Sequence, residues 1–484
     1  MRLFAPVSEA SLTGVRKGSL LTPSQLAQDP GSRRGTHTEE RAVVWKNVVG
    51  KYASVRRRAV ALGALGVAGV LLLTSCTTSD GGPDGSREEG RTLTVWSMDG
   101  DYSPETLAAV EERFTKATGA EVDVQVQTWE GIATKVSTAL ATDSPPDVLD
   151  IGNTQVAGYA ANGGLLDLTE HRDELAQGQA WLDGLVDPAT FDGHLFAVPG
   201  FAGARAVVYS KKLWAEAGVM TLPTSYQELT AALDKVKAAH SGTPDFSAFY
   251  LPGQYWYAGL QFVWDAGGRI AMQDGDTWWS ALSSRASRSG LEAFKEFQNA
   301  YSSASSATLN TLDPDQNQIF ADGKTSAILT TGVAGVLKAN PELSEDELGT
   351  FPMPGVDGGT QPVVLGGSNW AVAAKSRNAD LARQWIAVAT SPEVQRDFVH
   401  GVDGWIPNSR EGIEAAQSDL SEIERAFFTA ALTSESVPAN PNWAAIESNR
   451  EIESLFSSIA SGAKSVQEAS EEFDAAADDT LNGH

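Results

Sequence analysis

Strand-like and helix-like segments alternate through residues 93–151, and this order restricts the fold more than any other feature of the sequence. Apolar residues at every second position, or in one short run, indicate strands, and apolar residues spaced three to four apart indicate helices. The predicted strands are 93–96, 122–126 and 147–151, and the predicted helices are 104–118 and 132–140. Strand–helix–strand–helix–strand predicts an α/β domain with a largely parallel sheet.

Polar and aromatic residues follow each of these strands, in the loops that enter the helices. Ligands of such sheets bind beyond the carboxyl ends of the strands, so we expect these loops to form one rim of a binding site. Strand ends and helix caps would explain any one of the residues equally well, but they explain the whole set less well. The candidates on this rim are Trp96, Asp99, Asp101, Glu130, Asn153, Thr154 and Gln155.

The segment 250–264 is the most aromatic part of the chain. Aromatic faces pack against the C–H faces of sugar rings and over cations. Aromatic residues at helical spacing also form ordinary core, which is what we expect of Phe262 and Trp264. The candidates for ligand contact are Tyr255, Trp256 and Tyr257.

Small residues at 200–204 separate two strand-like runs and predict a crossing between domains. Arg205 follows directly. Its guanidinium suits bidentate bonds to a hydroxyl pair or a carboxylate of a ligand. An ion pair with one of the chain's own carboxylates would explain Arg205 equally well.

An arginine triplet at 56–58 precedes an uncharged apolar run at 59–73, as in a secretory signal peptide. The run is shorter than the roughly 20 apolar residues that span a bilayer. The residues 73–76, Leu-Thr-Ser-Cys, resemble the bacterial lipobox, which implies cleavage before Cys76 and a lipid on its sulfur. Cys76 is the only cysteine, so no disulfide forms within the chain.

We expect residues 1–50 to have no stable fold and to reflect a start codon placed too early, with the signal peptide at 51–75. Residues 76–91 are rich in Gly, Ser, Asp and Glu, which predicts a flexible tether. The chain is therefore expected to be held by a lipid on the outer face of the cytoplasmic membrane.

The net charge of the chain argues against a nucleic-acid partner. Residues 1–75 contain 11 Lys and Arg and 4 Asp and Glu, which leaves 25 basic and 58 acidic residues from Cys76 onward, a net formal charge of −33. Such a field repels nucleic acid, so we expect no nucleic-acid partner. Roughly 390 residues remain after the tether, enough for two domains.

The sequence contains few of the motifs that indicate an enzyme. The histidines are scattered without an HExxH pattern, and 313–317 begins like a calcium loop but lacks its glycine and its final glutamate. We therefore expect no metal site, no cofactor and no catalytic residues. A surface-held glycoside hydrolase stays open, because it needs only two well-placed carboxylates. A scaffold would show repeats, and no internal repeat is visible.

The order of short motifs after Arg91 resembles the family 1 extracellular solute-binding proteins, the sugar-binding, maltose-binding-protein-like lipoproteins of ABC importers. Each motif alone is weak, whereas their order and spacing are specific. The motifs are Pro146-Asp147-Val148, 160–168, Phe196-Ala197-Val198-Pro199, 208–213, Ala217-Gly218, Pro223-Thr224-Ser225, 320–327, 366–370, 382–386 and Ser391-Pro392-Glu393.

The resemblance implies a two-lobed, class II periplasmic-binding-protein-like α/β fold whose hinge closes over a ligand. It places lobe I at 92–202 plus 324–372, and lobe II at 203–323 plus 373–484. It also implies capture of a mono- or oligosaccharide for delivery to ABC permease subunits, without turnover and as a monomer. A non-sugar solute is the alternative ligand.

The resemblance adds further contact candidates from rim loops of the family. Thr331-Gly332-Val333 stand where maltose-binding protein has a tryptophan, so one stacking platform is missing and maltodextrin is a poor candidate. The added candidates are Ser368, Asn369, Trp405 and Trp443.

Overall fold

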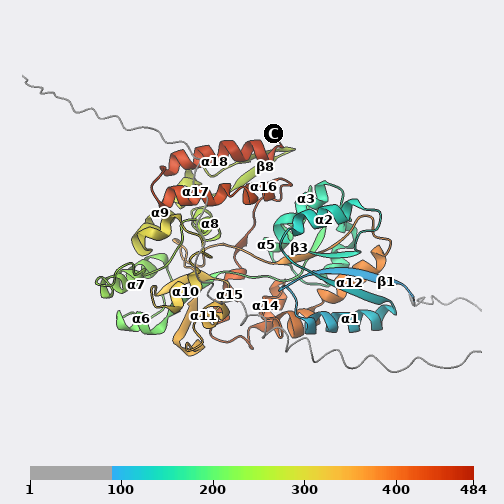
Figure 1. Cartoon of the computed structure of the whole chain (residues 1–484), viewed down its shortest axis with the longest axis horizontal. Coiled ribbons are helices and arrows are strands. Elements are labelled where there is room, and N and C mark those ends of the chain that lie inside the picture. The colour runs from blue at the N-terminus through green and yellow to red at the C-terminus, as the bar shows by residue number, and fades with distance from the viewer. Residues whose placement is uncertain (1–89, 484) are drawn as a thin grey trace, which may run out of the picture. The chain divides into compact units, whose positions relative to one another are not determined.

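The computed structural model describes residues 90–483. The predicted N-terminal extension, signal peptide, lipidated Cys76 and all but the last two residues of the tether lie outside the described residues. In the described part, two main sheets each form the centre of an α/β lobe (Figure 1).

The first sheet has the strand order β2-β1-β3-β13-β6. β1 runs parallel to β2 and β3, as predicted, whereas β13 runs antiparallel to both β3 and β6. The strands are β1 (Thr92–Met98), β2 (Glu121–Gln127), β3 (Val148–Gly152), β6 (Ala197–Pro199) and β13 (Ser368–Val372). The helices of this lobe are α1 (Pro104–Thr118), α2 (Ile132–Ala141), α3 (Val156–Ala161), α4 (Arg172–Ala176), α12 (Ala379–Ala389) and α13 (Pro392–Val394).

Helix α1 shows why local sequence specifies these elements. The Ser103 hydroxyl caps its start by accepting a hydrogen bond from the Thr106 amide, and Gly119 ends it with a left-handed φ of 80°. Its apolar face buries Phe114, whose ring meets Trp385 of α12 edge to face at 5.7 Å. Figure 1 shows α1 and α12 beside β1.

The second sheet has the order β10-β7-β11, with both pairs antiparallel. Its strands are β7 (Ala206–Ser210), β10 (Ala327–Thr330) and β11 (Leu348–Phe351). Alternate residues of a strand point to opposite faces, so both faces of β7 are covered. Val207 and Tyr209 join one apolar core, and Ala206 and Val208 join another.

Helices cover the two faces of this second sheet, and Figure 1 shows α17 and α18 side by side. The remaining helices of the described residues are α5 (Asp183–Val186), α6 (Lys211–Glu216), α7 (Tyr226–Ala239), α8 (Trp256–Asp265), α9 (Arg285–Tyr301), α10 (Gln316–Ala321), α11 (Ala334–Ala339), α14 (Arg410–Ala416), α15 (Arg425–Ala431), α16 (Trp443–Ser448), α17 (Glu451–Ala460) and α18 (Val466–Leu481). The short strands are β4 (Thr190–Phe191), β5 (His194–Leu195), β8 (Ala271–Asp274), β9 (Thr277–Ser280), β12 (Val363–Val364) and β14 (Ser434–Glu435).

The expected lobe boundaries need correction after residue 323. Strands β10 and β11 lie in the predicted lobe I range 324–372, but both hydrogen-bond to β7 in the second sheet. Helix α12 lies in the predicted lobe II range 373–484, but Trp385 belongs to the core of the first sheet. Only the segment from β13 to about residue 405 returns to the first lobe.

Three segments connect the lobes and hydrogen-bond to one another. Gly203 and Gly366 exchange backbone hydrogen bonds at 2.9 Å, and Ala202 exchanges bonds of 2.9 and 3.0 Å with Ile406. One of the three segments follows β6, where a crossing was predicted, and the other two lie near residues 366 and 406. We call these three connecting segments the hinge.

Candidate functional site

Arg205 lies where the first crossing enters β7, and it organises one side of the candidate site. Its Nε donates to the Tyr255 hydroxyl at 2.9 Å, and its guanidinium carbon sits 4.1 Å from the centre of the Tyr257 ring. Trp256 stacks on Tyr257 with ring centres 3.7 Å apart. Burial and the nearby Glu447 carboxylate raise the pKa of Tyr257 to about 12, so its hydroxyl stays neutral.

A cavity of about 410 Å³ opens beside this cluster. Its lining combines aromatic rings with amide, hydroxyl and guanidinium groups, the mixture that suits a small polar ligand. The lining residues are Arg205, Gln254, Tyr255, Trp256, Tyr257, Asn310, Thr311, Leu312, Asp315, Gln316, Asn317, Thr330, Thr331 and Glu453.

A second cavity, of about 480 Å³, shares Thr331 with the first and extends along the hinge. Gly203 and Trp405 line it, and a Cβ added at Gly203 would lie 3.7 Å from the Trp405 ring. Trp405 stacks on Phe201 at 4.6 Å and donates through Nε1 to the Asp101 carbonyl at 2.7 Å. The hinge thus holds Trp405 at the edge of a hollow that both lobes line.

The two predicted carboxylates on the loop after β1 lie in different environments. Asp99 is exposed, whereas Asp101 is buried and accepts a hydrogen bond from the Ser368 hydroxyl at 2.5 Å. Burial raises the pKa of Asp101 to about 6, although its hydrogen bonds to Ser368 and Asp150 lower it in part. Burial and the charge of Asp101 also raise the pKa of Asp150, on β3.

The segment that precedes α3 faces helix α16 of the second lobe. Thr154 donates to Glu447 Oε2 at 3.4 Å, and Trp443 donates to the other oxygen of Glu447 at 2.7 Å. Gln155 accepts a hydrogen bond from the Tyr159 hydroxyl at 3.2 Å. Burial raises the pKa of Glu447, and the bonds from Trp443 and Thr154 oppose that shift. These contacts join the predicted rim of the first lobe to the second lobe.

Several predicted contacts lie away from these cavities. Trp443 is fully buried in the apolar core that contains Val207 and Tyr209, and Asn369 is fully buried in β13. Trp96 lies in mid-strand, where its Nε1 donates to Gln125 at 3.0 Å. The Asn153 side chain donates to the Leu365 carbonyl at 2.9 Å, and Glu130 is exposed on the loop before α2.

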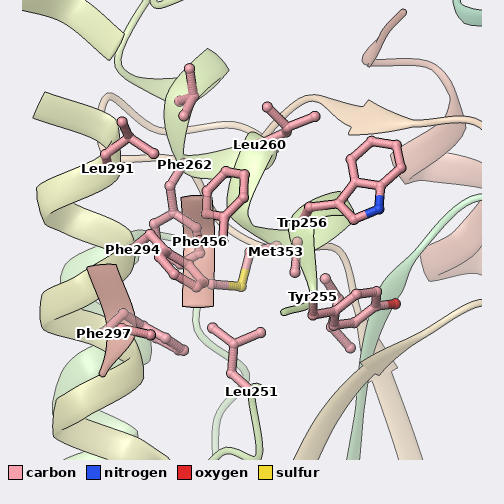
Figure 2. Packing of buried hydrophobic residues seen from close by; sticks show 14 of the residues in the cluster. Leu251, Tyr255, Trp256, Leu260, Phe262, Leu291, Phe294, Phe297, Met353 and Phe456 are labelled. Carbon is pink, nitrogen blue, oxygen red and sulfur yellow. The ribbon is translucent and has the colours of Figure 1, made fainter. Parts of the chain in front are cut away.

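Figure 2 shows Tyr255 and Trp256 at one side of the apolar core that also contains Phe294 and Phe297. Their polar atoms are directed away from these two phenylalanines. Both side chains are more than nine-tenths buried. They therefore contribute mainly to the wall of the cavity and to the core behind it.

Sequence reasoning missed several residues of the site. Gln316, Asn317 and Thr331 line the first cavity, but short polar runs gave no signal that separates them from ordinary loops. Trp129, next to the predicted Glu130 on the same loop, is 42% exposed, and a Cβ added at Gly152 would meet its ring at 3.6 Å.

Residues 90–483 contain no cluster of three or more His, Cys, Asp or Glu side chains that could hold a metal ion. None of the helices within the same residues is long and apolar enough to cross a membrane.

The profile of the family "Bacterial extracellular solute-binding protein" matches residues 100–396. The diacetylchitobiose binding protein DasA of Streptomyces coelicolor is 36% identical over 405 residues, which cover 82% of this chain and 92% of DasA. This chain belongs to the bacterial extracellular solute-binding protein family. The family predicted from the motifs is therefore confirmed, and with it the class of a solute-binding protein.

Two solved structures share the fold of this chain. The sugar-binding protein MalE from Xanthomonas citri superposes with a TM-score of 0.70 at 23% identity, covering 81% of this chain and 98% of MalE. The GacH receptor of Streptomyces glaucescens, solved unliganded and with acarbose, gives a TM-score of 0.63 at 20% identity, covering 82% of this chain and 100% of the receptor. The predicted two-lobed α/β fold is confirmed.

Proposed function

We propose that this chain is the carbohydrate-capturing subunit of an ABC-type importer and holds a mono- or oligosaccharide between its lobes. The observation that carries the proposal is the cavity beside Arg205 and Tyr257, which the second lobe lines and which meets, at Thr331, the cavity that both lobes line. An aromatic wall covers a sugar ring face, and neighbouring amides and hydroxyls bond to its hydroxyl groups. DasA, named for binding diacetylchitobiose, makes that disaccharide the first ligand to test.

The proposed role includes a lipid on Cys76, delivery of the sugar to membrane permease subunits, action as a monomer, and no catalysis. The carboxylates that line the first cavity support the last point. Asp315 Oδ1 accepts hydrogen bonds from the backbone and side chain of Asn317, and Glu453 pairs with Arg450. A glycoside hydrolase needs two carboxylates aimed at the substrate, and these two are occupied elsewhere.

A thermal-shift assay of the purified protein tests this function against a panel of diacetylchitobiose, cellobiose, maltose, peptides and polyamines. Ligand at 100 times its Kd stabilises the folded state by about 2.7 kcal/mol, which shifts the melting temperature visibly. We expect at least one sugar to produce this shift. A shift with peptides or polyamines but with no sugar would show that the ligand is not a carbohydrate.

A further inference from the structure

Gln316 has a hydrogen-bonding group that the protein leaves unused. The side chain lies at the start of α10, is 6% exposed and lines the first cavity. Its Nε2 donates to the Leu329 carbonyl at 3.3 Å, which orients the amide and turns Oε1 the other way. Within residues 90–483, this buried Oε1 accepts no hydrogen bond. A buried acceptor left unpaired costs about 1–3 kcal/mol, so a donor on a ligand would be favoured there.

Arg205 supplies a donor to the same cavity. The Tyr255 hydroxyl occupies its Nε, and the Val364 carbonyl lies 3.4 Å from one terminal nitrogen. In the described part of the chain, no carboxylate forms an ion pair with Arg205. The two acids that line the cavity are occupied, as described above, by the start of α10 and by Arg450.

This combination distinguishes between groups that sugars carry. An amide substituent offers a carbonyl for Arg205 and an N–H for Gln316 Oε1. A carboxylate would satisfy Arg205, but it has no proton for Gln316 Oε1 or for the Asn317 Oδ1, which is also buried and unpaired in the described residues. It would also enter a chain whose net charge is −26.

The mouth of the cavity adds an apolar contact. Leu312 is 81% exposed and belongs to the lining. An exposed leucine beside a polar pocket suits a small apolar group such as a methyl, because contact removes apolar surface of both from water.

We propose that Arg205 and Gln316 form a subsite for the 2-acetamido group, so that the ligands are N-acetylated amino sugars and their short oligomers. This inference rests on the proposed function, since it concerns the same cavity. In the subsite, Arg205 donates to the acetamido carbonyl, Gln316 Oε1 accepts from its N–H, and Leu312 contacts the methyl.

Calorimetric titration with three disaccharides tests the subsite: N,N′-diacetylchitobiose, cellobiose with hydroxyls in place of the acetamido groups, and a uronic-acid disaccharide. We expect the diacetylated sugar to bind roughly 10- to 100-fold more tightly than cellobiose, because one hydrogen bond to the otherwise unpaired Gln316 Oε1 and one to the Arg205 guanidinium are at stake. Equal affinities, or tightest binding of the uronic-acid sugar, would overturn the subsite and leave the proposed function standing. Silence with all three, together with a shift by another sugar of the panel above, would overturn the subsite alone, whereas silence with every sugar would overturn both.

Single-residue variants test which side chains cause the preference for diacetylchitobiose over cellobiose. Gln316→Leu is expected to lower the ratio of the two affinities to roughly 3-fold or less, since the acceptor is gone. Arg205→Lys, which keeps the charge but loses the planar fork, is expected to lower it as well. The matched control is Gln318→Leu on the exposed side of the same helix, which should keep the wild-type ratio. Each ratio is internal to one protein sample, so partial misfolding does not change it. An unchanged ratio in both cavity variants contradicts the proposal.

Discussion

The Thr154 hydroxyl donates to Glu447 Oε2 at 3.4 Å and connects the rim of the first lobe to helix α16 of the second. Glu447 is held from the other side by the Trp443 indole. A side chain that bonds across the gap between lobes favours the arrangement in which the lobes are close together. Ligand capture by hinge closure depends on contacts of this kind.

Removing this contact alone should change binding more than stability. Thr154→Val keeps the shape of the side chain, so we expect sugar affinity to fall roughly 3- to 10-fold, the equivalent of one hydrogen bond, with little change in melting temperature. Calorimetry and thermal unfolding measure the two quantities. Thr138→Val, on the exposed face of α2, is the control. Wild-type affinity in Thr154→Val would show that the contact plays no part in capture.

Two tryptophans should separate binding from folding. Trp129→Ala removes an exposed ring and should weaken sugar binding roughly 3- to 10-fold at nearly constant stability. Trp256→Ala empties a buried position and should reduce the free energy of unfolding by about 3–5 kcal/mol. Urea denaturation with calorimetry distinguishes the two. If Trp129→Ala unfolds early and Trp256→Ala does not, the assignment of surface and core is wrong.

The Asp101 carboxyl should make stability depend on pH. Its pKa is about 6 in the folded protein and near 3.8 when unfolded, so the folded state holds the proton more tightly. Stability from this group is therefore complete below about pH 4 and is lost as pH rises through about 6. Asp101→Asn should remove this loss. At pH 7.5 we expect a higher melting temperature and a free energy of unfolding that is larger by up to about 3 kcal/mol.

The control for that variant is the exposed neighbour Asp99→Asn, which should leave the melting temperature and its pH dependence unchanged. Thermal unfolding between pH 4 and 8 provides the comparison. A lower melting temperature of Asp101→Asn at pH 7.5 would mean that the charged form is stabilising, contrary to its burial.

Gly200 should tolerate no side chain, because Tyr102 and the start of β13 pack against it. A Cβ there would lie 2.4 Å from the Tyr102 hydroxyl and 2.8 Å from the Ser368 carbonyl. Gly200→Ala is expected to lower the free energy of unfolding by about 1–3 kcal/mol. Gly242→Ala, where no atom lies within 4 Å of the added Cβ, is the matched control. Urea denaturation that gives the same midpoint for both variants would contradict this packing.

Local patterns predicted the first lobe well, because each of its early elements carries its own signal. Ser103 and Gly119 mark the two ends of α1, and alternating valines mark β2. The later lobe boundaries depend on which sheet a short strand joins. β10 has four residues and β13 has five, and nothing within such short apolar runs specifies a partner so distant in sequence.

Only part of the candidate site was predicted, because the remaining residues, like the short strands, depend on contacts that the local sequence does not specify. Arg205, Tyr257 and Trp405 line the two cavities, and their contact with a ligand stays a prediction. Trp443 was expected there too, but its ring is buried, since an aromatic residue at helical spacing looks the same in a core and at a rim. Gln316 was missed because its role depends on the Leu329 carbonyl, which only the fold brings near.

Equilibrium dialysis of the purified protein against labelled diacetylchitobiose tests the central claim most directly, because it reports both capture and the chemical fate of the sugar. The account predicts an excess of label on the protein side that saturates at one disaccharide per chain, and recovery of intact disaccharide after the protein is denatured. No excess of label, or recovery of monosaccharides, would contradict it.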